Sequence, residues 1–238
     1  ARGEVGPDGH DQSLAARDLA QAAGFRIAAL YGVLLALVYA QELADYQDVR
    51  NGLVREAIAI ADVWHDAGRY GGPLAPVVQS AMERYVTFVV EREWHFLGTE
   101  ERLSNRAWNA REVALRVVLN AQPRTLAQST LRERMIRRLQ DIAEDRHLRG
   151  EMAAQGFGAI FWAPALIDLG LVVIPFHVFP PTRQAGVMLV AFGGFAGLIL
   201  FFIHGFSNPF RGPIALSPAP FERLIEHGIG SRSAQPLP

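Results

Sequence analysis

Residues 157–206 read FGAIFWAPALIDLGLVVIPFHVF, then PPTRQAG, then VMLVAFGGFAGLILFFIHGF. The first apolar run, 157–179, contains one acid, Asp168, and the second, 187–206, contains no Asp, Glu or Arg. A helix needs roughly 20 apolar residues to cross a bilayer core of about 30 Å. Two such runs are too apolar for soluble core helices in a chain of 238 residues. The sequence therefore predicts a transmembrane helical hairpin over 157–206, in an integral membrane protein.

A third apolar segment, 22–40, reads AAGFRIAALYGVLLALVYA and carries one charge, Arg26. Arg26 lies near the end of the segment, where a long side chain can reach the lipid headgroups. Length and content predict a transmembrane helix. The alternative is a buried helix of the soluble part, because the uncharged core is shorter here. Residues 1–21 read as an outward-facing tail and a helix start, with Ser13 as the N-cap.

The segment 41–156 is polar and nearly neutral, with 16 Arg and 17 Asp plus Glu. Apolar residues recur in it at helical spacing, and no alternation typical of strands is present. The sequence therefore predicts an all-α fold: three transmembrane helices, with a cytoplasmic helical bundle or stalk between the first and the second.

Glycines, prolines and capping residues predict the helix boundaries of this bundle. The stretch 68–76, GRYGGPLAP, separates two helices. Thr99, which two acids follow, and Thr125 each predict a helix start. On the last helix, Asp145 and Arg149 have the spacing of an ion pair on the solvent-exposed face.

Residues 207–238 close the chain and contain a cluster of prolines. The prolines predict a loop. A short amphipathic helix follows, capped by Ser217 and ended at Gly228, and we expect the remaining tail to be disordered.

Composition excludes several classes of function. The chain has no cysteine, which excludes disulfides, thiol catalysis and thiolate metal sites. A net charge of −1 argues against nucleic acid as a partner. All 23 basic residues are arginine, which we interpret as codon bias in a GC-rich bacterial genome. No signal peptide is recognisable at the start.

Arginines near the membrane ends predict the orientation, because cytoplasmic loops carry the excess of basic residues. The side of the N-terminal tail and of the turn at Pro180 has Arg2, Arg17 and Arg183. The other side has Arg50, Arg55, Arg138, Arg146, Arg149, Arg211 and Arg223. We therefore expect the segment 41–156 and the C-terminus in the cytoplasm of a bacterium, with the protein in its inner membrane.

Three stretches carry a resemblance to a known family: RNGLVREAIAIADVW at 50–64, ERYVTFVVEREW at 83–94 and SNPFRGPIALSPAPFERL at 207–224. In this order, and separated by the membrane helices, they resemble the bestrophin-like domain family of bacterial and plant membrane proteins, a domain of unknown function. The likeness spans roughly 24–228. Its most specific residues are Glu56, Ala57, Glu93, Trp94, Pro209, Phe210 and Gly212.

The family is named for its likeness to bestrophins, which are pentameric anion channels with four membrane helices and a cytosolic helical stalk. The resemblance therefore implies an oligomeric ion channel, by analogy. It also implies one more membrane helix before the first residue of this sequence. The expected partners are the lipid bilayer and either further copies of the chain or other subunits of a membrane complex. The alternative function is an accessory or scaffolding subunit of a larger bacterial membrane complex, without transport activity.

One face of the first membrane helix is a candidate pore lining. An apolar stripe that ends in an amide could form a constriction that gates by dewetting, and ordinary packing against the hairpin is the alternative. Acids follow at the end of the helix, and a negative entrance favours cations over anions. The candidate pore-lining residues are Ile27, Leu30, Leu34, Leu37 and Gln41, and the candidate ion entrance is Glu42, Asp45 and Asp48.

Asp168 is the only acid inside the hairpin, and an ionisable residue at this depth is a functional candidate by default. We expect it near the bilayer middle, level with Ala196. Three states are open for it. The carboxyl is protonated and bonded to a carbonyl or a tyrosine, ionised in a wet cavity, or paired with the charge of a partner.

Other candidate sites are weaker. Glu-x-x-His spacing at Glu144 and His147 resembles half of a di-iron motif, and Asp62 with His65 and Glu91 with His95 are related pairs. Solvated helix faces explain these pairs better, so we expect no metal and no cofactor. No glycine-flanked nucleophile motif is present, so we expect no enzyme. Glu56 and Glu93 could form an ion or partner site; the alternative is internal ion pairs with Arg50, Arg55 or Arg92.

Overall fold

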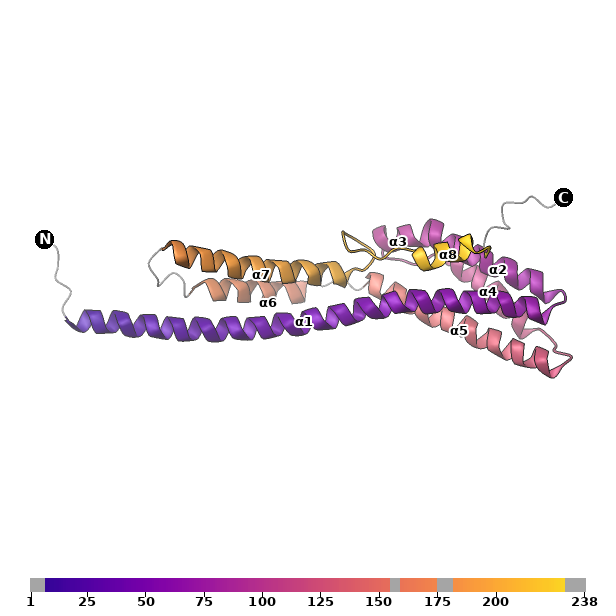
Figure 1. Cartoon of the computed structure of the whole chain (residues 1–238), viewed down its shortest axis with the longest axis horizontal. Coiled ribbons are helices and arrows are strands. Elements are labelled where there is room, and N and C mark those ends of the chain that lie inside the picture. The colour runs from indigo at the N-terminus through magenta and orange to yellow at the C-terminus, as the bar shows by residue number, and fades with distance from the viewer. Residues whose placement is uncertain (1–6, 155–158, 175–181, 230–238) are drawn as a thin grey trace. The chain divides into compact units, whose positions relative to one another are not determined.

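The computed structural model describes residues 7–154, 159–174 and 182–229 (Figure 1). Every regular element in these ranges is helical, which confirms the all-α prediction. The elements are α1 Pro7–Tyr70, α2 Leu74–Phe88, the π-helical segment η1 Val89–Glu93, α3 Trp94–Thr99, α4 Asn105–Leu119, α5 Leu126–Ala154, α6 Ala159–Val173, α7 Arg183–Ser207 and α8 Ala219–Glu226.

The chain divides into two compact units. The first consists of 1–44 and 157–206, and we call it the membrane unit because it contains the predicted spans. The second consists of 45–156 and 207–238, and we call it the helical unit. The C-terminal loop and α8, which follow the hairpin in sequence, thus belong to the helical unit.

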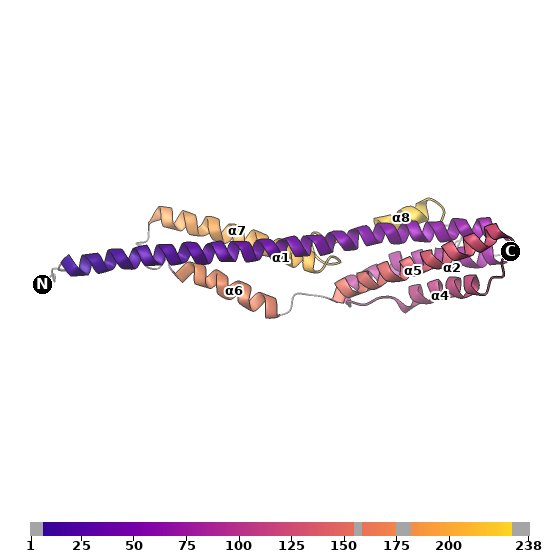
Figure 2. The ribbon, with the colours of Figure 1, turned by 90° about the horizontal axis from the view of Figure 1, so that it is seen from below.

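In the membrane unit, α6 and α7 lie beside the N-terminal part of α1 in both views (Figures 1 and 2). One apolar cluster joins the three helices. Its buried members are Tyr31, Leu35, Ala165, Val172, Ala196, Leu200 and Ile203. Most other apolar side chains of these helices are exposed, including Leu30, Leu166, Val190 and Phe195. Exposed apolar helices of this kind suit a lipid environment.

Two described helices are long and apolar enough to cross a membrane, namely α1 from Ala22 onward and α7. Few residues of their most apolar windows are buried, unlike those of a soluble core helix. The described part of α6 is shorter and contains Pro164. The predicted span 157–179 extends beyond it, onto residues that lie partly outside the described ranges.

The helical unit has its own core, in which α1, α2, α4, α5 and α8 meet. The buried members include Ile60, Val63, Met82, Tyr85, Ala114, Leu139 and Phe221. The α1–α2 turn falls at Gly71 and Gly72, as the 68–76 stretch predicts, and both have positive φ, 73° and 64°. Glycine adopts this conformation without a steric penalty. Thr125 caps α5 as predicted, because its hydroxyl accepts a hydrogen bond from the Gln128 N–H at 3.1 Å.

Two predicted helix starts are wrong. The first helix begins at Pro7 rather than after Ser13, and proline is well suited to a first helical position. Thr99 does not begin a helix but ends α3, and its hydroxyl donates to the His95 carbonyl at 2.8 Å. The chain then turns through Glu101, which has a φ of 54°. The next helix starts only after Ser104, which has an extended conformation.

Candidate functional site

A buried cluster of charged side chains lies at the centre of the helical unit, and we call it the charge centre. It consists of Glu56 from α1, Tyr85 from α2, Glu93 from η1, and Arg146 and Arg149 from α5. Glu56, Tyr85 and Glu93 have no exposed surface, and Arg149 and Arg146 are 1% and 6% exposed. Three separate parts of the sequence, α1, the consecutive elements α2 and η1, and α5, therefore contribute to one polar site inside an apolar core.

Arg149 bridges the two glutamates. Its Nη2 donates to Glu93 Oε1 at 2.6 Å, and its Nη1 donates to Glu56 Oε2. Arg146 Nη2 donates to the other Glu93 oxygen at 2.7 Å, and the Tyr85 hydroxyl donates to Glu56 Oε1 at 2.5 Å. Two arginines and two carboxylates balance in charge, which is the usual condition for burying ions in a protein.

The π-helical segment η1 places Glu93 in this cluster. A π-helical turn is rare and shifts the side chains that follow it around the helix axis, and such turns occur frequently at functional sites. Glu93 is the last residue of η1 and is fully buried, whereas Glu91 and Arg92 in the same segment are exposed. Glu93 Oε2 also accepts the backbone N–H of Ser104 at 2.8 Å, which fixes the start of α4.

The two glutamates have opposite pKa shifts. Burial raises the pKa of Glu56 above its ordinary value, against the charge of Arg149 and the hydrogen bond from Tyr85. Burial also acts on Glu93, but the charges of Arg149 and Arg146 outweigh it and hold the pKa of Glu93 below its ordinary value. The same two carboxylates raise the pKa of Arg149 despite burial, so Arg149 stays charged.

The charge centre is closed to solvent and its groups bond to one another. Only the Nε atoms of Arg146 and Arg149 have no hydrogen-bond partner among the described residues of this cluster. Such a site has no room for a substrate. It acts as an internal clamp, which means that its ion pairs and hydrogen bonds hold α1, α2, η1 and α5 together. Glu56 and Glu93 do form internal ion pairs, as one of the two interpretations predicted. Their partners are Arg149 and Arg146 rather than the predicted Arg50, Arg55 or Arg92. Arg55 instead pairs with Asp145 at 2.8 Å, and Arg50 and Arg92 are exposed.

The loop 207–218, here the closing loop, is attached to α3. Trp94 Nε1 donates to the Leu216 carbonyl at 3.1 Å, and its ring meets Phe210 edge to face at 5.5 Å. The Leu216 N–H in turn donates to the Pro209 carbonyl at 2.8 Å. Gly212 has a φ of 82°, a conformation that other residues rarely adopt. A Cβ at Gly98 would lie 3.0 Å from the Phe210 carbonyl oxygen, so the loop lies very close to α3.

These residues are the ones that carry the resemblance, and comparison with known families agrees with it. The Bestrophin-like domain matches residues 10–221. The chain belongs to this family. Comparison with curated proteins and with solved structures gives no match. Membership indicates a membrane protein, and members of the family are generally channels rather than enzymes.

In this bestrophin-like domain, the candidate pore stripe of α1 is largely uncovered. Leu30, Leu34 and Leu37 are 66%, 52% and 64% exposed, and Gln41 is also exposed. Ile27 alone is half-buried and packs on the cluster of the membrane unit. The neighbouring residues Tyr31 and Leu35 are buried against α6 and α7.

Of the candidate entrance residues, Glu42 and Asp45 are half-buried and Asp48 is exposed. Asp168 is half-buried on α6, close enough to Tyr31 of α1 to act on it electrostatically. The structure therefore brings Asp168 to the face of α6 that packs on α1, rather than to the pore stripe.

The paired acids and histidines do not form a common site. His147 pairs with Glu151 at 3.0 Å, and Asp62 pairs with Arg138 at 3.0 Å. Within the described ranges, no three metal-ligating side chains lie together.

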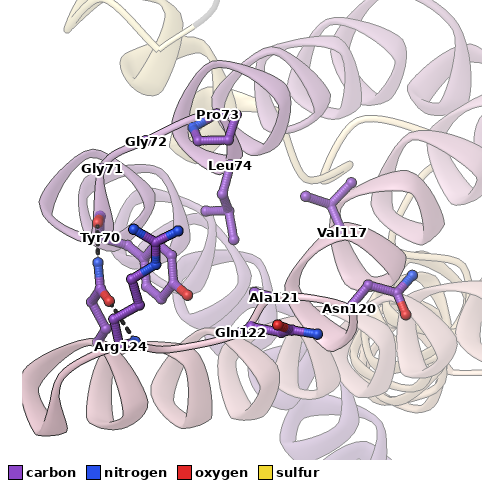
Figure 3. A pocket seen from close by; sticks show the side chains of 11 residues that line it. Tyr70, Gly71, Gly72, Pro73, Leu74, Val117, Asn120, Ala121, Gln122 and Arg124 are labelled. Atoms are coloured by element: carbon purple, nitrogen blue, oxygen red, sulfur yellow. Dashed lines mark hydrogen bonds between the residues drawn. The ribbon is translucent and has the colours of Figure 1, made fainter.

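A surface pocket of about 470 Å³ lies between the α1–α2 turn and the α4–α5 turn (Figure 3). Gln128 bridges these turns, because its Nε2 donates to the Tyr70 carbonyl at 3.2 Å and its Oε1 accepts the Arg124 N–H at 2.8 Å.

Sequence reasoning missed the three partners in the charge centre: Tyr85, Arg146 and Arg149. One signal was available for α5. Arg146 and Arg149 are three residues apart, and the same helix face carries Met135, Leu139 and Ile142, which are buried. Arginines that continue an apolar stripe require buried acids as partners.

Proposed function

We propose that this bestrophin-like protein is a subunit of an oligomeric ion channel in a bacterial inner membrane, with three membrane helices in this chain. The third span includes α6. The helical unit lies in the cytoplasm, as the distribution of arginines favours. The family supports a channel-like membrane protein.

The observation that carries the proposal is the exposed stripe Leu30, Leu34 and Leu37. The described helices of the membrane unit pack on Tyr31 and Leu35 and leave this stripe uncovered. Equivalent stripes from several copies would surround an axis and form a narrow apolar constriction that gates by dewetting. Beyond the stripe, Glu42 and Asp45 continue the neighbouring face of α1, and they would make the mouth negative and favour cations.

Replacing both acids tests this function. In vesicles that contain the purified protein, the double variant Glu42→Asn, Asp45→Asn should lower cation permeability relative to chloride, seen as a shift in reversal potential. Asp141→Asn is the matched control, because Asp141 is a half-exposed acid of α5. Unchanged reversal potentials in the double variant would remove these acids from the pathway. Absence of current, with a single copy bound to other proteins in mild detergent, would establish an accessory subunit instead.

Labelling tests the orientation separately. The chain has no native cysteine, so single cysteines give a clean signal. Arg183→Cys should react with an impermeant thiol reagent in intact cells, and Glu133→Cys should react only after lysis. The reverse labelling pattern would contradict the proposed orientation and would not bear on channel activity.

A further inference from the structure

The membrane unit contains a polar pair that the pore stripe does not include. Tyr31 is 3% exposed, and its hydroxyl is fully buried without a hydrogen-bond partner among the described residues. A buried hydroxyl without a partner costs about 1–3 kcal/mol. The carboxyl of Asp168 is the charge that acts on it.

The position of Asp168 on α6 supports this pairing. Ala165 and Val172, three residues before and four residues after Asp168, are buried in the same cluster as Tyr31. Residues at this spacing lie on one helix face. Asp168 therefore lies on the face of α6 that turns toward the apolar cluster shared with α1 and α7, and not on a face that only lipid would contact.

No cation of the described membrane unit stands at this depth. On α7, the residue beside Tyr31 is Phe192, with ring centroids 6.4 Å apart. At 1.5 Å per residue, Arg183 lies about 13 Å before Phe192 along the helix, and His204 lies about 18 Å after it. On α1, Arg26 lies about 8 Å before Tyr31 along the helix, and its side chain is exposed. Tyr31 is also the midpoint of the apolar segment 22–40, so the pair lies where an uncompensated carboxylate is most costly.

We propose that Asp168 and Tyr31 together bind one monovalent cation, a proton or an alkali-metal ion, between α1 and α6. The carboxylate supplies the negative charge and the tyrosine hydroxyl supplies a neutral oxygen, which are ligands that hard cations prefer. Binding one positive charge makes the pair neutral and satisfies the buried hydroxyl. This site does not depend on channel activity, because it lies within one chain and away from the stripe.

Difference infrared spectroscopy of the full chain in lipid tests the proposal, since a protonated carboxyl absorbs apart from a carboxylate. In neutral buffer with choline as the only salt cation, the wild type should show a protonated-carboxyl band that Asp168→Asn loses and Asp168→Glu retains. Tyr31→Phe should shift this band, because the variant removes the hydroxyl oxygen that completes the proposed site. Glu133→Gln, which removes an exposed carboxyl of α5, should leave the band unchanged.

Sodium titration then distinguishes the two occupants. Loss of the band as sodium is added identifies an alkali-metal site, and a band that persists identifies a proton site. If wild type and Asp168→Asn have the same spectrum in choline and in sodium, the proposal is wrong. A band that Tyr31→Phe leaves unshifted would likewise exclude the pair as the site.

Discussion

The helical unit and the membrane unit each bury ionisable side chains, and the two units neutralise them differently. In the helical unit, Glu56 and Glu93 meet two arginines and a tyrosine inside the chain. In the membrane unit, the charge of Asp168 acts on the hydroxyl of Tyr31, which has no hydrogen-bond partner among the described residues. The charge centre is complete by itself, whereas the membrane pair requires something from outside.

The difference follows from the surroundings of each centre. A bundle in water can recruit charged side chains from several helices, and each ion then has a partner. A helix in lipid tolerates few charges, so its acids have few partners within the chain and serve as sites for ions or protons. The buried charges of the helical unit are thus neutralised within the chain, and the buried acid of the membrane unit provides a candidate binding site.

The largest expected effect is on the charge centre. Arg149→Met should lower the free energy of unfolding by about 3–5 kcal/mol, because it leaves two buried carboxylates without their shared partner. Arg138→Met is the matched control on the same helix, since Arg138 is 40% exposed and pairs with Asp62 and Asp141. Surface pairs contribute about 0–1 kcal/mol. Chemical unfolding in detergent measures the free energy of unfolding of both variants. Equal effects of the two variants would mean that the charge centre stabilises the helical unit no more than a surface ion pair does.

A pair of tyrosine variants compares the two units directly. Tyr85→Phe removes the hydrogen bond to Glu56, and hydrogen bonds to charged groups contribute about 1.5–3 kcal/mol. Tyr31→Phe removes a hydroxyl that bonds to no described residue, so its cost should stay below about 1.5 kcal/mol. The thermal unfolding midpoint of each variant in detergent tests this. A Tyr31 variant that is the less stable of the two would contradict the comparison.

The same contrast explains what the sequence could predict. Local signals predicted the helices, the break at Gly71 and Gly72, and the cap at Thr125, because each depends on neighbouring residues. The short C-terminal helix is also present as α8, Ala219–Glu226, but its N-cap is Pro218 rather than the predicted Ser217.

Long-range partners were not predictable from spacing. Asp145 and Arg149 are four residues apart, yet Arg149 turns inward to Glu56 and Glu93, which are 93 and 56 positions away in sequence. Asp145 pairs with Arg55 instead. The π-helical turn that directs Glu93 inward has no sequence signal that we recognised. For Asp168, hydropathy identified the acid as unusual, but only the packing of α6 on α1 brings Tyr31 to it.

The acid side of the stability profile is a smaller test of the charge centre. The folded state lowers the pKa of Glu93, so its stabilisation is present above its ordinary value of about 4.3 and is lost as pH falls through the lowered pKa. Burial raises the pKa of Glu56. Ionisation of Glu56 therefore destabilises the folded state, and this destabilisation appears as pH rises above the same ordinary value. Unfolding midpoints measured against pH should therefore flatten below about pH 4.3 in Glu93→Gln. A profile that is unchanged in that range would exclude Glu93 as the titrating group.

The smallest expected effect belongs to Asp168→Asn, because an amide keeps a polar partner for Tyr31 and needs no counter-charge. We expect its unfolding midpoint and its assembly in mild detergent to match those of the wild type.

Asp168→Leu should instead weaken the contact between α1 and α6, because it leaves the buried Tyr31 hydroxyl without any polar neighbour, at a cost of about 1–3 kcal/mol. Ile167→Leu is the control, since Ile167 is 62% exposed on the same helix. If Asn lowers stability as much as Leu does, the negative charge itself stabilises the unit through the cation that it binds. If Leu is as stable as the wild type, Asp168 does not serve the packing of α1 on α6. The membrane unit would then hold its helices together by apolar contacts alone, in full contrast to the charge centre.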